Sequence, residues 1–180
     1  MKKHSETTQQ WWDRVSNSQE EMINWLKAQY HGEATAEKRI REAINRYKLK
    51  GIKAKIINSI ADDEAKHTKW VAKLLKDRGI TPEILQKEER YWNKVLPKEL
   101  EYNNFKYFAA VGHLAETMRL DRITLLASDT RFKDIAKVMS KIYPDELFHA
   151  RAFKELSNKK RIKQAKVYHT EGMNAIGLLP

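Results

Sequence analysis

The chain has 180 residues, of which 35 are Lys or Arg, 24 are Asp or Glu and none is Cys. This length suits one domain whose hydrophobic core can fold without crosslinks. The absence of Cys excludes a disulfide-stapled secreted scaffold, a Cys-ligated zinc ribbon, an iron–sulfur cluster and a thiol nucleophile. These features predict a single domain over residues 1–180 in a reducing cytoplasm.

The charge and hydropathy patterns disfavour two further classes of protein. No stretch approaches the ~20 apolar residues that span a bilayer, and the first residues lack the apolar core of a secretory signal. The formal net charge is +11, but Lys and Arg are scattered along the chain, so we expect a well-solvated basic surface rather than a nucleic-acid site. The densest basic cluster comprises Lys159, Lys160, Arg161, Lys163 and Lys166.

Apolar residues recur every three or four positions over long stretches, and the few Gly and Pro fall mostly between these stretches. This periodicity predicts an all-α protein. The capping box Ser18-Gln19-Glu20-Glu21 starts the first helix, and Gly51 is expected to end it. The second helix is expected to end at Gly79 in the position of a C′ residue.

A connector and three more helices are expected after Gly79. The run Thr81-Pro82-Glu83 predicts a short connector helix, because Pro is favoured at the first helical position. The expected ranges are Pro82 to about Asn93 for the connector, about Lys98 to Ser128 and Asp129 to Leu156 for two long helices, and 158–180 for a basic helix with a loose end.

Each of the four long helices carries polar residues at positions that belong to its apolar stripe. In the second helix the stripe runs 56, 60, 64, 67, 71, 74, so a Glu-x-x-His pair points toward the core, and the fourth helix repeats this arrangement. Buried charges are expensive unless they are paired or bind a metal, and a pair of divalent Fe or Mn ions would balance the set. The six residues are Glu33, Glu64, His67, Glu116, Glu146 and His149.

The spacing of these six residues divides them into two matching half-sites. The lone Glu precedes the Glu of the pair by 31 residues in the first half and by 30 in the second. The midpoints of these intervals, 48.5 and 131, lie within about three residues of the turn signals at Gly51 and Asp129-Thr130, as two antiparallel hairpins require. The 52 residues between the halves leave room for a long crossover, which is the plan of a ferritin-like four-helix bundle.

On these motifs the chain resembles the ferritin-like superfamily of di-iron carboxylate proteins, over about residues 18–156. That superfamily includes rubrerythrins, bacterioferritins, aldehyde-deformylating oxygenase and the demethoxyubiquinone hydroxylases. The segments Tyr30-His31-Gly32-Glu33 and Asp62-Asp63-Glu64-Ala65-Lys66-His67 look like the ligand segments of several of these groups. The resemblance implies a bundle core at about 18–157, a basic C-terminal segment at 158–180, and two Fe ions, with Mn/Fe as an alternative.

The resemblance also implies roles for individual residues. The terminal ligands would be Glu33 and His67 for one metal ion, Glu116 and His149 for the other, and the bridging ligands would be Glu64 and Glu146. Residues that could orient these ligands or add to them, with a surface role as the alternative, are Glu37, His113, Asp63, Asp121 and Asp145.

Small residues surround two of the expected ligands. Ala109, Ala110, Gly112 and Ala115 precede Glu116, and Gly32, Ala34 and Ala36 surround Glu33. Such residues either leave a substrate cavity or allow close helix packing, and the sequence leaves both readings open.

Three functions follow from a carboxylate-bridged Fe(II) pair, which can deliver two electrons to O2 or peroxide. The first is an oxidase or oxygenase acting on a small organic substrate. The second is a rubrerythrin-like peroxidase or a ferroxidase that handles iron. The third is a di-iron hydroxylase acting on RNA, which the absence of an aromatic-interleaved motif disfavours. Since no Cys can hold a rubredoxin centre, an external donor protein would supply electrons; a homodimer is left open.

Overall fold

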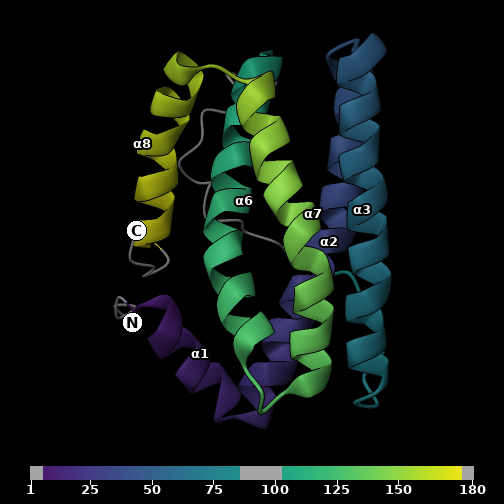
Figure 1. The fold of residues 1–180 in the computed structure, drawn as a ribbon, viewed down its shortest axis with the longest axis vertical. Coiled ribbons are helices and arrows are strands. Elements are labelled where there is room, and N and C mark those ends of the chain that lie inside the picture. Colours follow the sequence, from purple (N-terminus) through teal and green to yellow (C-terminus); the bar gives the residue numbers. More distant parts are fainter. Residues whose placement is uncertain (1–5, 86–102, 176–180) are drawn as a thin grey trace. The chain divides into compact units, whose positions relative to one another are not determined.

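The computed structural model describes residues 6–85 and 103–175. Over these residues it contains six α-helices and no strand, which confirms the predicted all-α class. The helices are α1 (Thr8–Ser16), α2 (Gln19–Arg46), α3 (Gly51–Lys76), α6 (Phe105–Ser128), α7 (Lys133–Leu156) and α8 (Lys159–Ala175) (Figure 1). No helix in this described part is long and apolar enough to cross a membrane.

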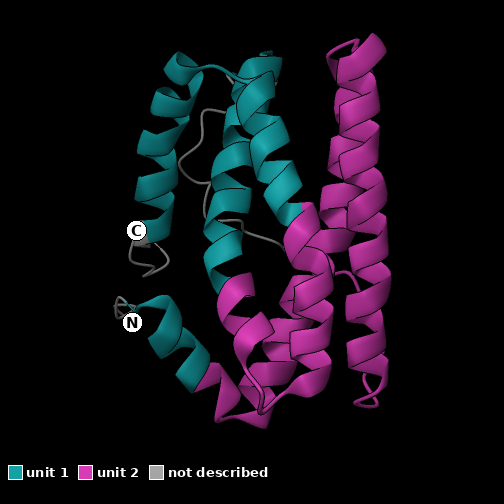
Figure 2. Ribbon diagram, in the orientation of Figure 1, with its two compact units in different colours: residues 1–13, 88–122, 146–180 teal, residues 14–87, 123–145 magenta. Residues whose placement is uncertain are grey.

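The chain divides into two compact units, which are described separately below (Figure 2). Both α6 and α7 are shared between the units, since the division falls after Arg122 and after Asp145. Unit 1 comprises Met1–Asp13, Glu88–Arg122 and Glu146–Pro180, and unit 2 comprises Arg14–Lys87 and Ile123–Asp145.

The first long helix of unit 2, α2, begins where the capping box predicts. The Oγ atom of Ser18 accepts a hydrogen bond from the backbone N–H of Glu21 at 3.3 Å. The helix ends earlier than Gly51, because Lys48 adopts a left-handed φ of 51° and the N–H of Leu49 donates to the carbonyl of Ile44. The prediction that Gly51 ends this helix is therefore wrong, and Gly51 instead begins α3.

The second long helix of unit 2, α3, ends as predicted. Gly79 has a φ of 73°, and the N–H of Ile80 donates to the carbonyl of Leu75 at 3.0 Å, which completes a Schellman motif. Within unit 2, α2 and α3 run side by side in opposite directions (Figure 1). Their buried faces include Leu26, Ile40, Ile57 and Ile60.

The connector helix does not begin at Pro82, because residues 80–85 are not helical. The backbone N–H of Leu85 donates instead to Nδ1 of His31 on α2 at 3.1 Å, which ties this stretch to unit 2. The rest of the predicted connector helix, 86–93, lies outside the described residues.

The third long helix, α6, begins at Phe105 because Asn104 caps it: the side-chain oxygen of Asn104 accepts from the N–H of Tyr107. The predicted start at Lys98 falls outside the described residues, and positions 103–104 are not helical. The fourth, α7, begins at Lys133 rather than at 129, because Asp129 accepts from the backbone N–H of Arg131 in the preceding turn.

The basic C-terminal helix is confirmed as α8, and it packs within unit 1. Asn158 caps it by accepting from the N–H of Arg161. Ala165 of α8 is buried in one cluster with Tyr107 and Ala110 of α6. The polar lysines of α8 therefore face away from a small apolar seam that holds it to α6.

The first helix, α1, is not predicted by the apolar pattern. A reciprocal capping box begins it, because Thr7 Oγ1 accepts from the N–H of Gln10 and Gln10 Oε1 accepts from the N–H of Thr7. The Thr-x-x-Gln spacing is the sequence signal that could have revealed it.

Candidate metal centre

The first half-site lies in unit 2, where α2 contributes Glu33 and α3 contributes Glu64 and His67. All three side chains are fully buried. The Nδ1 atom of His67 lies 3.5 Å from Oε2 of Glu33 and 4.0 Å from Oε2 of Glu64. One ligand atom from each residue lies within 4.8 Å of the others, which is close enough for the three to share one metal ion.

Two neighbouring side chains hold this half-site in position. The Oδ2 atom of Asp145, at the end of the part of α7 in unit 2, lies 3.2 Å from Nε2 of His67. Gln29, one turn before Glu33, donates its side-chain N–H to Oε1 of Glu33. A proton on Nε2 that is donated to Asp145 puts the lone pair of the imidazole on Nδ1, the atom that faces the carboxylates.

The second half-site lies in unit 1, where α6 contributes Glu116 and α7 contributes Glu146 and His149. Glu116 is 5% exposed, and the other two are fully buried. The Nδ1 atom of His149 lies 3.3 Å from Oε2 of Glu146. Arg119 joins the two carboxylates: its Nη1 lies 3.3 Å from Oε2 of Glu116, and its Nη2 lies 3.3 Å from Oε1 of Glu146.

The two carboxyl groups of this half-site titrate far apart. Burial raises the pKa of Glu116 to about 8; the charge of Glu146 acts in the same direction and Arg119 opposes it. Burial also acts to raise the pKa of Glu146, but the Arg119 charge and a hydrogen bond with His149 outweigh it and hold this pKa well below its usual range.

Both half-sites suit a divalent metal ion. Each presents two carboxylates and one imidazole within a buried region, and this donor set of hard oxygen and nitrogen atoms is one that Fe and Mn accept. Three ionisable groups are costly to bury together unless a cation balances them. The donor chemistry and the burial thus agree with a metal in each half-site.

The other predicted site residues of unit 2 differ in their surroundings. Asp145 contacts His67, as described above. Asp63 is buried and accepts a hydrogen bond from Lys66 Nζ at 2.7 Å. Glu37 lies in a partly exposed network, in which Arg41 bonds it at 2.6 Å and also reaches Asp62.

In unit 1, His113 and Asp121 are the remaining predicted residues. The Nδ1 atom of the half-buried His113 bonds the carbonyl of Ala150 at 2.9 Å, so this imidazole links α6 to α7. Burial lowers the pKa of His113, against the effect of that hydrogen bond. Asp121 is exposed.

Two residues beside the ligands were missed by the sequence reasoning. Gln29 lies four residues before Glu33, and Arg119 lies three residues after Glu116. Residues at these spacings share a helix face with the ligand, so the helical period alone is a signal that could have found them.

The small residues near the ligands serve different purposes in the two units. In unit 1, a Cβ atom added to Gly112 would lie 2.9–3.1 Å from ring atoms of Phe153, so this glycine is needed for close packing of α6 on α7. In unit 2, a Cβ atom added to Gly32 would meet no atom of the described residues within 4 Å.

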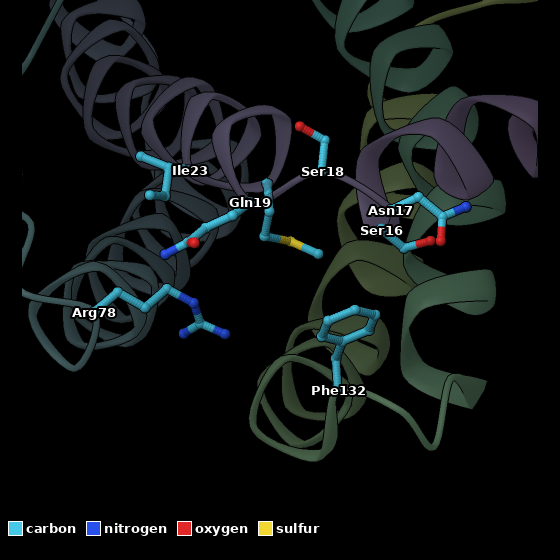
Figure 3. Close-up of a pocket in the computed structure, with 8 residues that line it drawn as sticks. Ser16, Asn17, Ser18, Gln19, Ile23, Arg78 and Phe132 are labelled. Atoms are coloured by element: carbon cyan, nitrogen blue, oxygen red, sulfur yellow. The ribbon is translucent and has the colours of Figure 1, made fainter.

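A cavity of about 280 Å³ opens in unit 2 near the start of α2, where Ser18, Arg78 and Phe132 line it (Figure 3). Arg78 is already paired with Asp134 at 2.8 Å. None of the eight residues that line this cavity is a predicted metal ligand, so we do not assign it to the metal centre.

Helices that carry buried Glu and Glu-x-x-His define the class of carboxylate–histidine metal proteins with an α-helical fold. A comparison with protein families then identifies the family within this class. The rubrerythrin family model matches residues 24–157, and the chain belongs to this family. This match confirms the predicted resemblance and the ferritin-like fold class. No curated protein and no solved structure gives a significant match.

Proposed function

We propose that this protein is a di-iron oxidoreductase that reduces peroxide or O2 with electrons from an external donor. The observation that carries the proposal is the repeat of one buried arrangement, Glu with Glu-x-x-His, in each of the two units. Membership of the rubrerythrin family supports a di-iron centre.

Six residues of this chain would hold the two metal ions. Glu33, Glu64 and His67 would form the ligand set of unit 2, and Glu116, Glu146 and His149 that of unit 1. When bound, a pair of Fe(II) ions supplies the two electrons that reduce peroxide to water. Burial keeps bulk water away from the six side chains, and Asp145 and Gln29 orient His67 and Glu33. A mixed Mn/Fe pair remains an alternative on the same donor set.

A small oxidant is favoured over an organic substrate at the half-site of unit 1. The glycine one turn before Glu116 is in contact with Phe153, so the small residue there serves packing rather than a cavity. We therefore place peroxide or O2 reduction first.

Oxidation of a small organic substrate is the second candidate, and one observation favours it. Gly32 adjoins Glu33, and a Cβ atom added to Gly32 would have no atom of the described residues within 4 Å. A substrate would have to approach the half-site of unit 2 from that side.

Electrons would come from another protein. The chain has no Cys and therefore cannot hold an iron–sulfur or rubredoxin-type centre through thiolates. Because this chain has a net charge of +11, an acidic protein would be the favoured donor. Both proteins would work in the cytoplasm.

The site is tested by removing one ligand from each unit and measuring bound iron by elemental analysis. We expect two metal ions per chain in the wild type, and fewer in E64A and in H149A. Glu37→Ala is the matched control, because Glu37 lies on α2 but pairs with Arg41 at the surface. Retention of two metal ions in both ligand variants would overturn the assignment.

The reaction is tested by stopped-flow mixing of the reduced, iron-loaded protein with peroxide, O2 or excess Fe(II). Rapid stoichiometric oxidation by peroxide supports the first proposal. Stalled oxidation by O2 that resumes only with an organic substrate supports the second. Sustained turnover of Fe(II) into a soluble mineral would instead identify an iron-handling protein.

A further inference from the structure

Arg119 places a positive charge at the half-site of unit 1. It lies on α6 one turn after Glu116, and its guanidinium spans the two carboxylates, with one Nη atom 3.3 Å from Glu116 and the other 3.3 Å from Glu146. Both carboxyl groups are buried, whereas the side chain of Arg119 is 22% exposed. Arg119 thus contacts the oxygen atoms that a metal ion would need.

A guanidinium and a divalent ion cannot share these oxygen atoms without cost. Two cations near the same pair of carboxylates repel each other strongly where solvent is excluded. A metal ion also needs lone pairs of Glu116, whose Oε2 accepts from an N–H of Arg119, and of Glu146, whose Oε1 is ion-paired with the same guanidinium. Binding of the ion therefore requires Arg119 to leave at least one carboxylate.

Arg119 has a route out of the half-site. Its side chain is long and partly exposed, so it can turn toward solvent while α6 stays in place. The residue is therefore suited to alternate between contact with the carboxylates and contact with water.

We propose that Arg119 is an internal cation that balances the carboxylates of unit 1 in the metal-free protein and competes with the metal ion for them. This inference rests on the proposed function, because it takes Glu116 and Glu146 as metal ligands. Arg119 lowers the affinity of this half-site for its ion and stabilises the empty state, so the ion in unit 1 is the more readily lost and reloaded of the two.

Removal of Arg119 should change the stability of the metal-free protein and its metal affinity in opposite directions. Without Arg119, the buried carboxyl groups of Glu116 and Glu146 lose the positive charge beside them, so the metal-free protein must become less stable. The same change removes the competitor, so one of the two metal sites must bind more tightly. A residue that only supports the structure would weaken both properties.

The test compares R119M, which keeps the length of the side chain but not its charge, with R119K and the wild type. Anaerobic calorimetric titration with Mn(II) gives the affinity, and urea unfolding in EDTA gives the stability. We expect R119M to unfold at lower urea and to bind one of two ions about tenfold more tightly, as the loss of one charged hydrogen bond implies. R119K should remain close to the wild type.

Arg122→Met is the matched control, because Arg122 lies on the same helix but stacks on the ring of Trp11 at 4.4 Å. It should leave the Mn(II) affinity unchanged. R119Q, which keeps a side-chain donor without the charge, replaces R119M if that variant does not fold. Unchanged or weaker Mn(II) binding by the uncharged variant would overturn the inference, whereas a wild type that binds no Mn(II) or Fe(II) would overturn the proposed metal centre itself.

Discussion

Asp145 Oδ2 lies 3.2 Å from Nε2 of His67, and this contact decides which nitrogen of the imidazole faces Glu33. A ring held by its Nε2–H presents Nδ1, and Nδ1 is the atom found 3.5 Å from the carboxylate of Glu33. The carboxylate also makes the imidazole a stronger electron donor. Asp145 is one residue before Glu146, so a single segment of α7 contributes to both half-sites.

We expect D145A to weaken metal binding about 10- to 100-fold, which is the usual effect of losing a carboxylate behind a ligating histidine. D145N should fall between D145A and the wild type, because its amide oxygen can still accept from Nε2. Titration with Fe(II) or Co(II) under anaerobic conditions measures the affinity. The control is D62A, which removes an exposed Asp that pairs with Arg41 instead. Equal affinities in D145A and the wild type would contradict this role.

A matched pair of glycine substitutions should have opposite effects on stability. G112A places a methyl group 2.9–3.1 Å from the ring of Phe153, and such overpacking costs about 1–3 kcal/mol. G32A meets no described atom and replaces a helical glycine by alanine, which favours the helix by about 1 kcal/mol. Urea unfolding of the metal-free variants gives both values. Equal destabilisation by the two substitutions would show that contact with Phe153 is not the cause.

The sequence was sufficient to predict the burial of the candidate ligands, because their signal is a spacing on helices. Glu64 and His67 are three residues apart on the buried stripe of α3, and the structure buries both completely. The burial of Glu33, Glu116, Glu146 and His149 follows from the same period. A polar residue on an apolar stripe can be recognised from the sequence without knowledge of the tertiary structure.

The helix ends were harder to predict, because the residue that closes a helix depends on which of several candidates takes the left-handed conformation. Gly79 does so at the end of α3, as glycine usually does, whereas Lys48 rather than Gly51 does so after α2. Asp145 was expected as a residue that could orient a ligand, but its pairing with His67 and the contact of Arg119 with Glu146 were not predicted. Each of these two contacts joins different helices, and the period of one helix does not reveal it.

The seam between α8 and α6 gives a third prediction. Ala165 is 1% exposed beside the fully buried Tyr107, so A165D would bury a carboxylate and destabilise the packing by about 2 kcal/mol or more. The adjacent K166D, at an exposed position, should change stability by no more than about 0.5 kcal/mol. Hydrogen exchange of residues 159–175 measures the effect locally. If K166D opened α8 as much as A165D, charge rather than the apolar seam would hold the helix.

The last prediction concerns the pH dependence of the metal-free protein. Burial lowers the pKa of His113 below its ordinary value of 6.5, and Lys154 adds to this effect, while the carbonyl of Ala150 opposes it. Near and below pH 6.5 the unfolded chain therefore binds more protons at this residue than the folded chain does. The contribution of His113 to stability is present above pH 6.5 and is lost as the pH falls below 6.5 and through the lower pKa of the folded chain.

We expect His113→Asn to flatten this dependence, since its amide can still donate to the carbonyl of Ala150 but does not titrate. Thermal unfolding in EDTA from pH 7.5 to 5.5 should show a smaller fall in melting temperature for H113N than for the wild type. K154Q provides a graded comparison, because it removes the charge that adds to the effect of burial on the pKa of His113 and should reduce the fall only in part. A wild type and H113N with parallel pH profiles would show that His113 is protonated equally in the folded and unfolded chains.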